Sequence, residues 1–155
     1  MNQLLGIRRF IGSLRTKLRH GKLSRAPLEL LELRLRGTAA ECDWMARSPD
    51  AWDADLSALE RERNAASQAL QDAIAVRELL FKTLHQVRTA DFRVYRPSDD
   101  SRTNLIIAGT VTREQGARSE IHSLPMRAKL CGFRFLLNNG ALEPLDLQPA
   151  DQEKK

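Results

Sequence analysis

The stretch Leu28-Glu29-Leu30-Leu31-Glu32-Leu33-Arg34-Leu35-Arg36 decides between a helical and a mixed fold. Its last four residues alternate strictly between leucine and arginine, which is the pattern of a half-buried strand. The leucines and glutamates over 28–35 also favour a helix, and that is the competing interpretation. Gly37-Thr38 breaks the pattern, and residues 40–46 alternate again. We therefore expect a β-hairpin here.

Downstream of this hairpin, apolar residues at helical spacing predict one long helix, from about Ala54 to about Val87. Ser48-Pro49-Asp50 is typical of a helix start, with a capping serine and a proline in the first turn. Glu78 and Lys82 lie four residues apart on the polar side, and we expect them to form an ion pair.

The rest of the chain alternates strand signals with one short helix. Strands are predicted over 91–96 and 105–111, a helix over 125–131, and a hairpin of 133–137 with 141–145 around Asn138-Asn139-Gly140. Gly109, inside a strand, indicates a bulge or a close approach of another backbone.

Together these elements predict an α+β fold: a small antiparallel sheet with one long helix packed on a face, preceded by a basic amphipathic N-terminal helix. Residues 28–147 are expected to form this single domain. Residues 1–27 would be a basic arm and linker, and residues 148–155 a disordered polar tail.

Residues 69–145 resemble a BON domain, a small αββαβ module of bacterial envelope proteins. A helix over 69–84 precedes a strand pair, and the apolar strand 105–111 runs into Gly-x-Val. Gly132-Phe133, followed by Leu136 and Asn138, is similar to the end of the family pattern. Pro125 lies inside what would be the second helix and departs from that pattern. The resemblance implies association with phospholipid or a membrane surface.

The N-terminal arm carries the charge asymmetry of the chain. Residues 1–28 hold seven basic residues and no acid, whereas the remainder holds 18 basic and 20 acidic residues. The seven candidates for contact with an anionic partner are Arg8, Arg9, Arg15, Lys17, Arg19, Lys22 and Arg25. Residues 4–18 also form an apolar stripe at helical spacing, and this candidate docking face comprises Leu4, Ile7, Phe10, Ile11, Leu14 and Leu18. Gly6 and Gly12 weaken such a helix by about 1 kcal/mol each relative to alanine.

Several partners suit an arm of this kind. The stripe could dock on the body of the protein or on a partner subunit, leaving the cations in solvent. A cationic amphipathic helix also suits an anionic membrane surface. Nucleic acid is the alternative, although Phe10 is the only residue of the arm that could stack on bases. An arginine-rich, acid-free leader also resembles an organelle transit peptide.

Both tryptophans, Trp44 and Trp52, lie in an acidic segment over 41–55. They are candidate interface aromatics, since tryptophan often anchors interfaces. The alternative is that Trp44 is a core residue of a strand and that Trp52 packs at the helix start.

No motif indicates a catalytic, metal or cofactor site. Cys42 and Cys131 lie far apart, and His20, His85 and His122 lack a second metal ligand at helical spacing. We therefore expect no enzyme and no cofactor, and no small-molecule substrate is evident. A small enzyme with an unrecognised site is the second alternative. The N-terminus is not that of a secretory signal, so the expected place is the cytoplasm, with a peripheral position at the membrane in one alternative. The predicted function is a binding or adaptor protein that acts at a membrane surface or in a protein complex.

Overall fold

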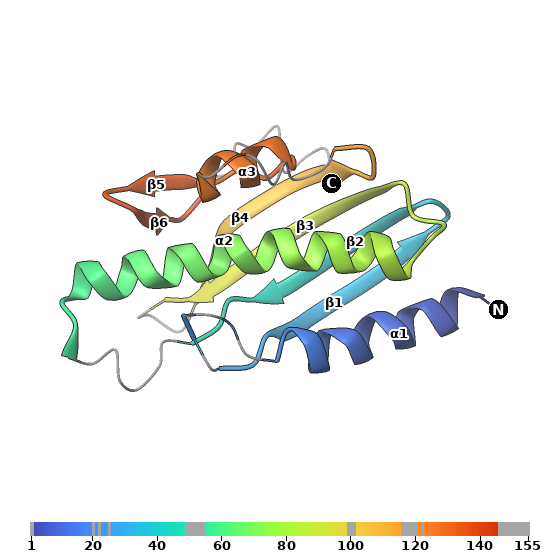
Figure 1. Cartoon of the computed structure of the whole chain (residues 1–155), viewed down its shortest axis with the longest axis horizontal. Helices are drawn as coiled ribbons and strands as arrows, with labels where there is room; N and C mark the ends of the chain where they lie inside the picture. Colours follow the sequence, from blue (N-terminus) through green and yellow to red (C-terminus); the bar gives the residue numbers. More distant parts are fainter. Residues whose placement is uncertain are drawn as a thin grey trace.

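The structure, a computed structural model, describes residues 2–19, 21, 23–24, 26–48, 55–98, 102–115, 121 and 123–145. Within these residues the pattern helix, strand, strand occurs three times (Figure 1). In chain order the elements are α1 (Asn2–Lys17), β1 (Glu29–Arg36), β2 (Ala39–Met45), α2 (Ala58–Thr83), β3 (Thr89–Pro97), β4 (Thr103–Thr112), α3 (Leu124–Leu130), β5 (Leu136–Asn138) and β6 (Ala141–Glu143). The predicted tail over 148–155 lies outside the described residues.

The first four strands form one sheet in the order β1-β2-β3-β4. The α+β prediction is confirmed, with a long helix on the sheet and a helix before it. One detail differs, because β2 and β3 run parallel and the sheet is therefore mixed rather than wholly antiparallel. The reason is α2, whose 26 residues span about 39 Å. It carries the chain back along the sheet, so β3 starts at the same end as β2.

The stretch 28–36 is a strand, and the helical alternative for it is wrong. Leu33 and Leu35 are half-buried, whereas Arg34 and Arg36 are exposed. The alternation therefore outweighs helix propensity here, because a strand buries every second leucine against the helices. The turn at Gly37 has a positive φ of 60°, which glycine adopts without strain.

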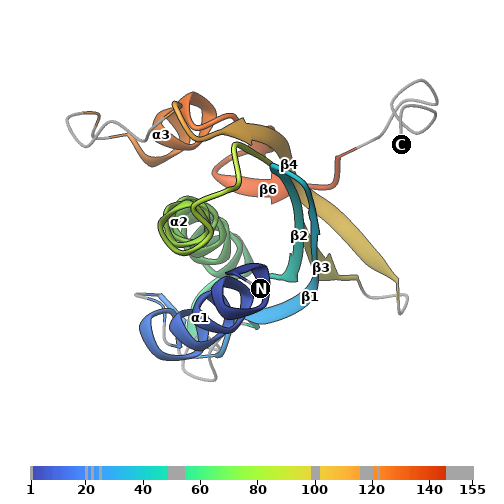
Figure 2. The same ribbon diagram turned by 90° about the vertical axis from the view of Figure 1, so that its right-hand side faces the viewer.

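Two layers enclose the core: α1 and α2 both lie on one face of the sheet (Figure 2). The inner face of the central strands is buried and apolar, and its residues are Ala40, Cys42, Trp44, Ala90, Phe92, Val94, Ile107 and Val111. The opposite face carries a polar row. One row across the four strands reads Arg34, Glu41, Asp91 and Thr110.

The helix start predicted at Ser48-Pro49-Asp50 falls mostly on residues 49–54, which lie outside the described residues. Helix α2 begins later, with Ser57 as its N-cap, and the Ser57 hydroxyl accepts a hydrogen bond from the Glu60 amide at 3.2 Å. Serine followed three residues later by glutamate is the sequence pattern of a capping box, so this start had a local signal.

Arg113, the residue after β4, covers the C-terminal end of α2. Its guanidinium donates to the carbonyl oxygens of Phe81 and Leu84 at 2.8 Å each, and to those of Val87 at 3.0 Å and His85 at 3.3 Å. The last carbonyls of a helix have no partner inside the helix and lie at the negative end of its dipole. The guanidinium of Arg113 donates hydrogen bonds to these carbonyls and also places a positive charge at the negative end of the dipole.

Arg47, two residues beyond β2, does the same for α1. Its Nε and Nη2 donate to the carboxylate oxygens of Asp72 at 2.8 and 3.2 Å, and both side chains are buried. The remaining donors bond the carbonyl oxygens of Leu18 at 2.6 Å, Arg19 at 3.1 Å and Ala26 at 2.8 Å. All five N–H groups of this guanidinium therefore have an acceptor.

Gln68 extends this cluster to the linker. Its amide nitrogen donates to Asp72 at 2.9 Å, and its oxygen accepts from the Leu23 amide at 2.6 Å. Burial raises the pKa of the Asp72 carboxyl, and the hydrogen bond and charge of Arg47 oppose this rise only in part. One ion pair thus joins α1, the linker, the end of β2 and the middle of α2.

The third helix–strand–strand unit packs beside β4. Ala108 of β4 and Arg134 exchange backbone hydrogen bonds at 3.0 and 2.6 Å. The close approach predicted at Gly109 is confirmed, because a Cβ there would clash with the carbonyl oxygen of Gly132. The predicted hairpin is also present, and its turn residues Asn139 and Gly140 have positive φ angles of 55° and 84°.

We predict that Arg47→Met lowers the free energy of unfolding by about 3–5 kcal/mol, because it leaves Asp72 as a buried charge without a counter-ion. The loss should shrink at acid pH. A carboxyl whose pKa lies above its unfolded value binds its proton more tightly in the folded state. Stability is then greatest below the unfolded pKa and falls as the pH rises through the folded pKa. Urea unfolding of the variant across this pH range measures both effects.

The matched control is Arg34→Met, which breaks the exposed Arg34–Glu32 pair and should cost about 0.5 kcal/mol or less. Equal losses for the two variants, or a loss for Arg47→Met that is independent of pH, would contradict the structural role given to Arg47.

A second prediction concerns Gly109→Ala, which should destabilise the protein by about 1–3 kcal/mol, because the added methyl meets backbone atoms that cannot move away cheaply. The control is Gly12→Ala in α1, where a Cβ meets nothing within 4 Å. That change should stabilise the helix by about 1 kcal/mol. Thermal unfolding of both variants measures the difference, and two shifts of the same sign would count against the packing seen at Gly109.

Candidate anionic-partner interface

The apolar stripe of α1 packs on the body of the protein. Phe10 is fully buried, Leu14 is buried, and Ile7, Ile11 and Leu18 are half-buried against the same core. Docking on the chain's own body, one of the alternatives for the stripe, is therefore what the structure shows. A different member of the predicted face, Leu4, is 59% exposed and lies beyond this contact.

Gly6 explains how α1 comes so close to α2. A Cβ at Gly6 would lie 2.8 Å from the Leu84 side chain and 3.4 Å from the Thr83 carbonyl oxygen. The sequence suggested only that this glycine weakens the helix. In the structure, the absence of a side chain at Gly6 also lets the two helices pack closely.

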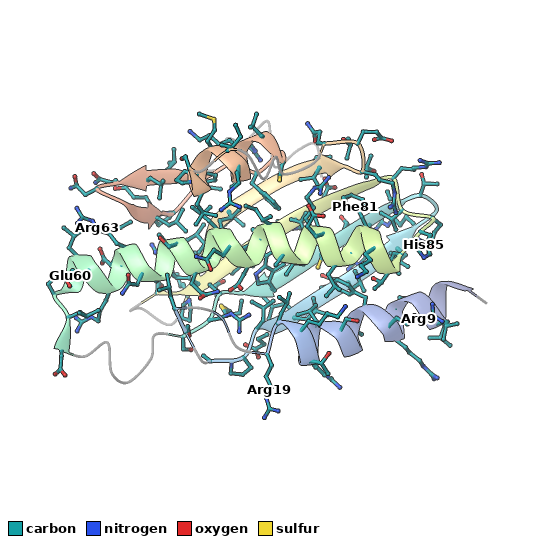
Figure 3. The ribbon with its side chains drawn as sticks, in the orientation of Figure 1. Arg9, Arg19, Glu60, Arg63, Phe81 and His85 are labelled. Atoms are coloured by element: carbon teal, nitrogen blue, oxygen red, sulfur yellow. The ribbon has the colours of Figure 1, made fainter. Side chains whose placement is uncertain are left out.

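The cations of α1 remain in solvent. Arg8, Arg9, Arg15, Lys17 and Arg19 are all exposed. Within the part of the chain that the structure describes, none of them makes an ion pair. Figure 3 shows Arg19 pointing away from the body at one end of α1, with Arg9 nearer the other end. The remaining two predicted cations, Lys22 and Arg25, lie outside the described residues.

Two rows of exposed residues run along α1. One comprises Leu5, Arg9, Gly12 and Thr16, and the other Leu4, Arg8 and Arg15, with exposed Arg19 just beyond the helix end. Their spacings of three, four and seven residues place each row on one side of the helix. Each row begins with an exposed leucine at the N-terminal end. The first row then holds one cation, Arg9, and the second holds Arg8 and Arg15.

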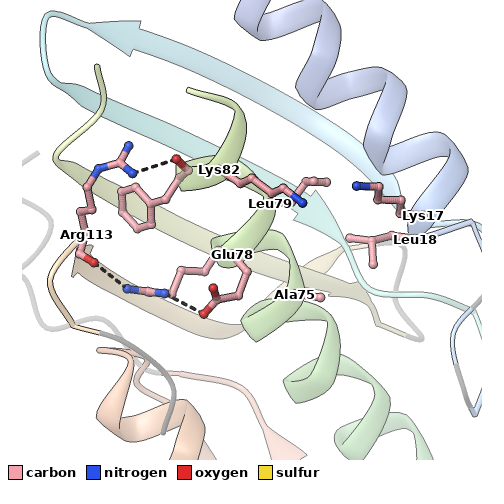
Figure 4. A pocket seen from close by; sticks show the side chains of 9 residues that line it. Lys17, Leu18, Ala75, Glu78, Leu79, Lys82 and Arg113 are labelled. Atoms are coloured by element: carbon pink, nitrogen blue, oxygen red, sulfur yellow. Dashed lines mark hydrogen bonds and ion pairs between the residues drawn. The ribbon is translucent and has the colours of Figure 1, made fainter. Parts of the chain in front are cut away.

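A groove separates α1 from the C-terminal part of α2, and we call it the α1–α2 groove. It consists of two adjoining hollows of about 550 and 580 Å³, and Lys17 and Lys82 line both. The first hollow is also lined by Arg9, Thr16 and His85 and by no acidic residue. Figure 4 shows the amino groups of Lys17 and Lys82 pointing toward one another across the second.

The ion pair predicted between Glu78 and Lys82 is wrong. Glu78 accepts a hydrogen bond from the Nη1 of its neighbour Arg77 at 2.9 Å instead. Arg77 is held in place because it also donates to the carbonyl oxygens of Thr112 and Arg113 at 3.0 and 3.3 Å. The fixed guanidinium of Arg77 thus binds the Glu78 carboxylate, and the amino group of Lys82 faces that of Lys17 instead.

Sequence reasoning missed Lys82 and His85 as residues that line a groove beside the cations of α1. They lie more than 60 residues from the end of α1, and only the docking of α1 brings them beside it. The sequence carries no local signal for that contact.

Of the two tryptophans, the structure describes Trp44. Trp44 is fully buried and packs edge-on against Phe92, with ring centroids 5.7 Å apart. Its role as an interface aromatic is therefore wrong, because its side chain points into the core between sheet and helices. Trp52 lies outside the described residues.

Cys42 and Cys131 are both free and buried. Burial raises the pKa of each thiol, so both favour the neutral form, which is a poor nucleophile and metal ligand. Over the described ranges, no three histidine, cysteine or acidic side chains gather in a way that could hold a metal ion. His20 and His122 lie outside these ranges, and His85 is exposed.

No helix among the described residues is long and apolar enough to cross a membrane. Comparison with protein-family models, with curated proteins and with solved structures found no match for this chain. The BON-like resemblance over 69–145 therefore stays an expectation, and the argument for function rests on the geometry of α1 and the α1–α2 groove.

Proposed function

We propose that this protein is a non-enzymatic binding protein that attaches to an anionic membrane surface through the exposed side of α1. The observation that supports this most is the combination of exposed, unpaired cations with exposed Leu4 and Leu5 at the N-terminal end of the same helix. Cations attract the surface, and the two leucines enter its interfacial layer.

The mode differs from that of a free amphipathic helix. The apolar stripe is occupied by the core, so α1 cannot lay that stripe into lipid while it stays docked. Five exposed cations at up to about 1 kcal/mol each supply up to about 5 kcal/mol near an anionic leaflet, and salt screens this attraction. Leu4 and Leu5 retain 59% and 52% of their surface exposed, so their burial adds roughly 1 kcal/mol each.

Nucleic acid is less well supported as a partner. Single-stranded nucleic acid is commonly held by stacking bases on exposed aromatic side chains. The phenylalanines and Trp44 are all buried, and Tyr95 is half-buried. The described part of the chain thus offers charge for a polyanion but no stacking surface.

We predict that the wild-type protein partitions onto phosphatidylcholine vesicles only when they contain phosphatidylserine, and that partitioning falls steeply with salt. Arg8→Gln/Arg15→Gln/Arg19→Gln should weaken it by at least ten-fold, since each cation near the surface contributes roughly 1 kcal/mol. Leu4→Ser/Leu5→Ser should weaken it several-fold. Co-sedimentation with vesicles measures both effects, and circular dichroism checks that α1 is retained.

Two matched controls distinguish binding through α1 from binding by any exposed cations or leucines of the protein. Arg34→Gln/Arg36→Gln removes exposed cations from β1, and Leu136→Ser/Leu137→Ser removes exposed leucines from β5. Both should bind like the wild type. Partitioning that ignores the α1 variants would refute the proposal and favour the BON-like region as the lipid contact. A steeply salt-dependent shift of generic DNA, without any binding to vesicles, would favour nucleic acid instead.

A further inference from the structure

The α1–α2 groove has the charge of an anion site. Five cations line its two hollows. Arg77 and Arg113 are bonded to backbone carbonyl oxygens of the fold, which leaves Lys17 on one wall, Lys82 on the other and Arg9 at one end. The amino groups of Lys17 and Lys82 face each other (Figure 4). Two like charges directed at one gap repel, and an anion placed between them removes that repulsion.

The nearest acid does not fill this role. Glu78 lines one hollow, but its carboxylate is bonded to Arg77 at 2.9 Å. Among the residues that the structure describes, no carboxylate forms an ion pair with Lys17 or Lys82. The positive charge of the groove is therefore not balanced from within the described fold.

The end of α2 would ordinarily work against an anion here, because the C-terminal end of a helix carries partial negative charge. Arg113 removes this obstacle. It covers the carbonyl oxygens of Phe81, Leu84 and His85 with hydrogen bonds of 2.8 to 3.3 Å. Its own positive charge also lies on the wall of the groove.

Two of the hydroxyl groups of the groove are already used as donors. The Thr16 hydroxyl donates to the Gly12 carbonyl at 3.1 Å, and the Thr83 hydroxyl to the Leu79 carbonyl at 2.8 Å. The donors left for a ligand are therefore mostly charged, with the Ser13 hydroxyl and the His85 ring beside them. A ligand with several anionic oxygens fits such a site better than a neutral polar one.

We propose that the α1–α2 groove binds the phosphomonoester headgroup of an anionic membrane lipid between Lys17 and Lys82, with Arg9 as a third contact. A phosphomonoester carries close to two negative charges and three acceptor oxygens at neutral pH, so it can bridge both lysines. A phosphodiester headgroup has one charge and two free oxygens. This proposal rests on the proposed function, because Arg9 shares one side of α1 with exposed Leu5.

The test compares vesicles of phosphatidylcholine mixed with either phosphatidic acid or phosphatidylserine, matched in zeta potential. The wild-type protein should bind phosphatidic acid at least five-fold more tightly. Lys17→Gln/Lys82→Gln should bring the ratio of the two affinities close to one. The control Arg8→Gln/Arg15→Gln removes the same charge outside the groove, so it should weaken binding to both lipids and keep the ratio.

The outcomes distinguish this proposal from the one before. Equal binding to both lipids by the wild type, or an equal loss of preference in the control, would overturn the groove site while leaving membrane attachment in place. Absence of binding to either lipid would refute both.

A second measurement uses inorganic phosphate as a probe. Titration followed by amide NMR shifts should move Gly12 and Thr83, relative to chloride at the same ionic strength, and leave Gly37 in place. Shifts that are scattered over the surface, or absent in the groove, would overturn the site. Saturation by inorganic phosphate that is as tight as binding to phosphatidic acid vesicles would identify free phosphate, and not lipid, as the ligand.

Discussion

The arrangement of helices on the sheet depends on the hydrogen bonds of one guanidinium, that of Arg47. It joins the last carbonyls of α1 to Asp72 of α2 and to the linker, in a place that water does not reach. An arginine is needed there, because a lysine could not hold two carboxylate oxygens and three separate carbonyl groups at once. A buried charge so fully bonded fixes relative position more than it adds stability.

The fold's topology explains why an arginine occurs at this point. In a helix–strand–strand unit, the second strand of the hairpin returns to where the first began, and the first begins beside the helix C-terminus. A residue just beyond the second strand therefore meets the exposed carbonyls of its own helix. Arg47 meets α1 and Arg113 meets α2 in this way. In both units, an arginine just beyond the second strand binds the unpaired carbonyls at the C-terminal end of the helix.

Local periodicity was enough to predict which elements exist, because the alternation in 28–36 and the spacing of the α2 stripe record burial directly. It was not enough for features that depend on distant residues. Arg47 lies in an acidic, tryptophan-containing segment and has no local mark of burial. The parallel pairing of β2 with β3 and the meeting of Lys17 with Lys82 likewise follow from how α1 and α2 dock. The candidate site was half predictable: the cations of α1 were identified, but their partners on α2 were not.

The docking of α1 also decides how a basic helix can act. Moving Phe10 and Leu14 from the core into lipid exchanges one apolar environment for another, so it gains little. The bonds between Arg47 and the end of α1 have no replacement in a membrane interface, and a swing of the helix would strain or break them. The balance therefore favours a helix that stays docked and presents its charges from a fixed position. A fixed set of cations opposite Lys82 can distinguish between anions by shape and charge, which a freely moving basic arm cannot do.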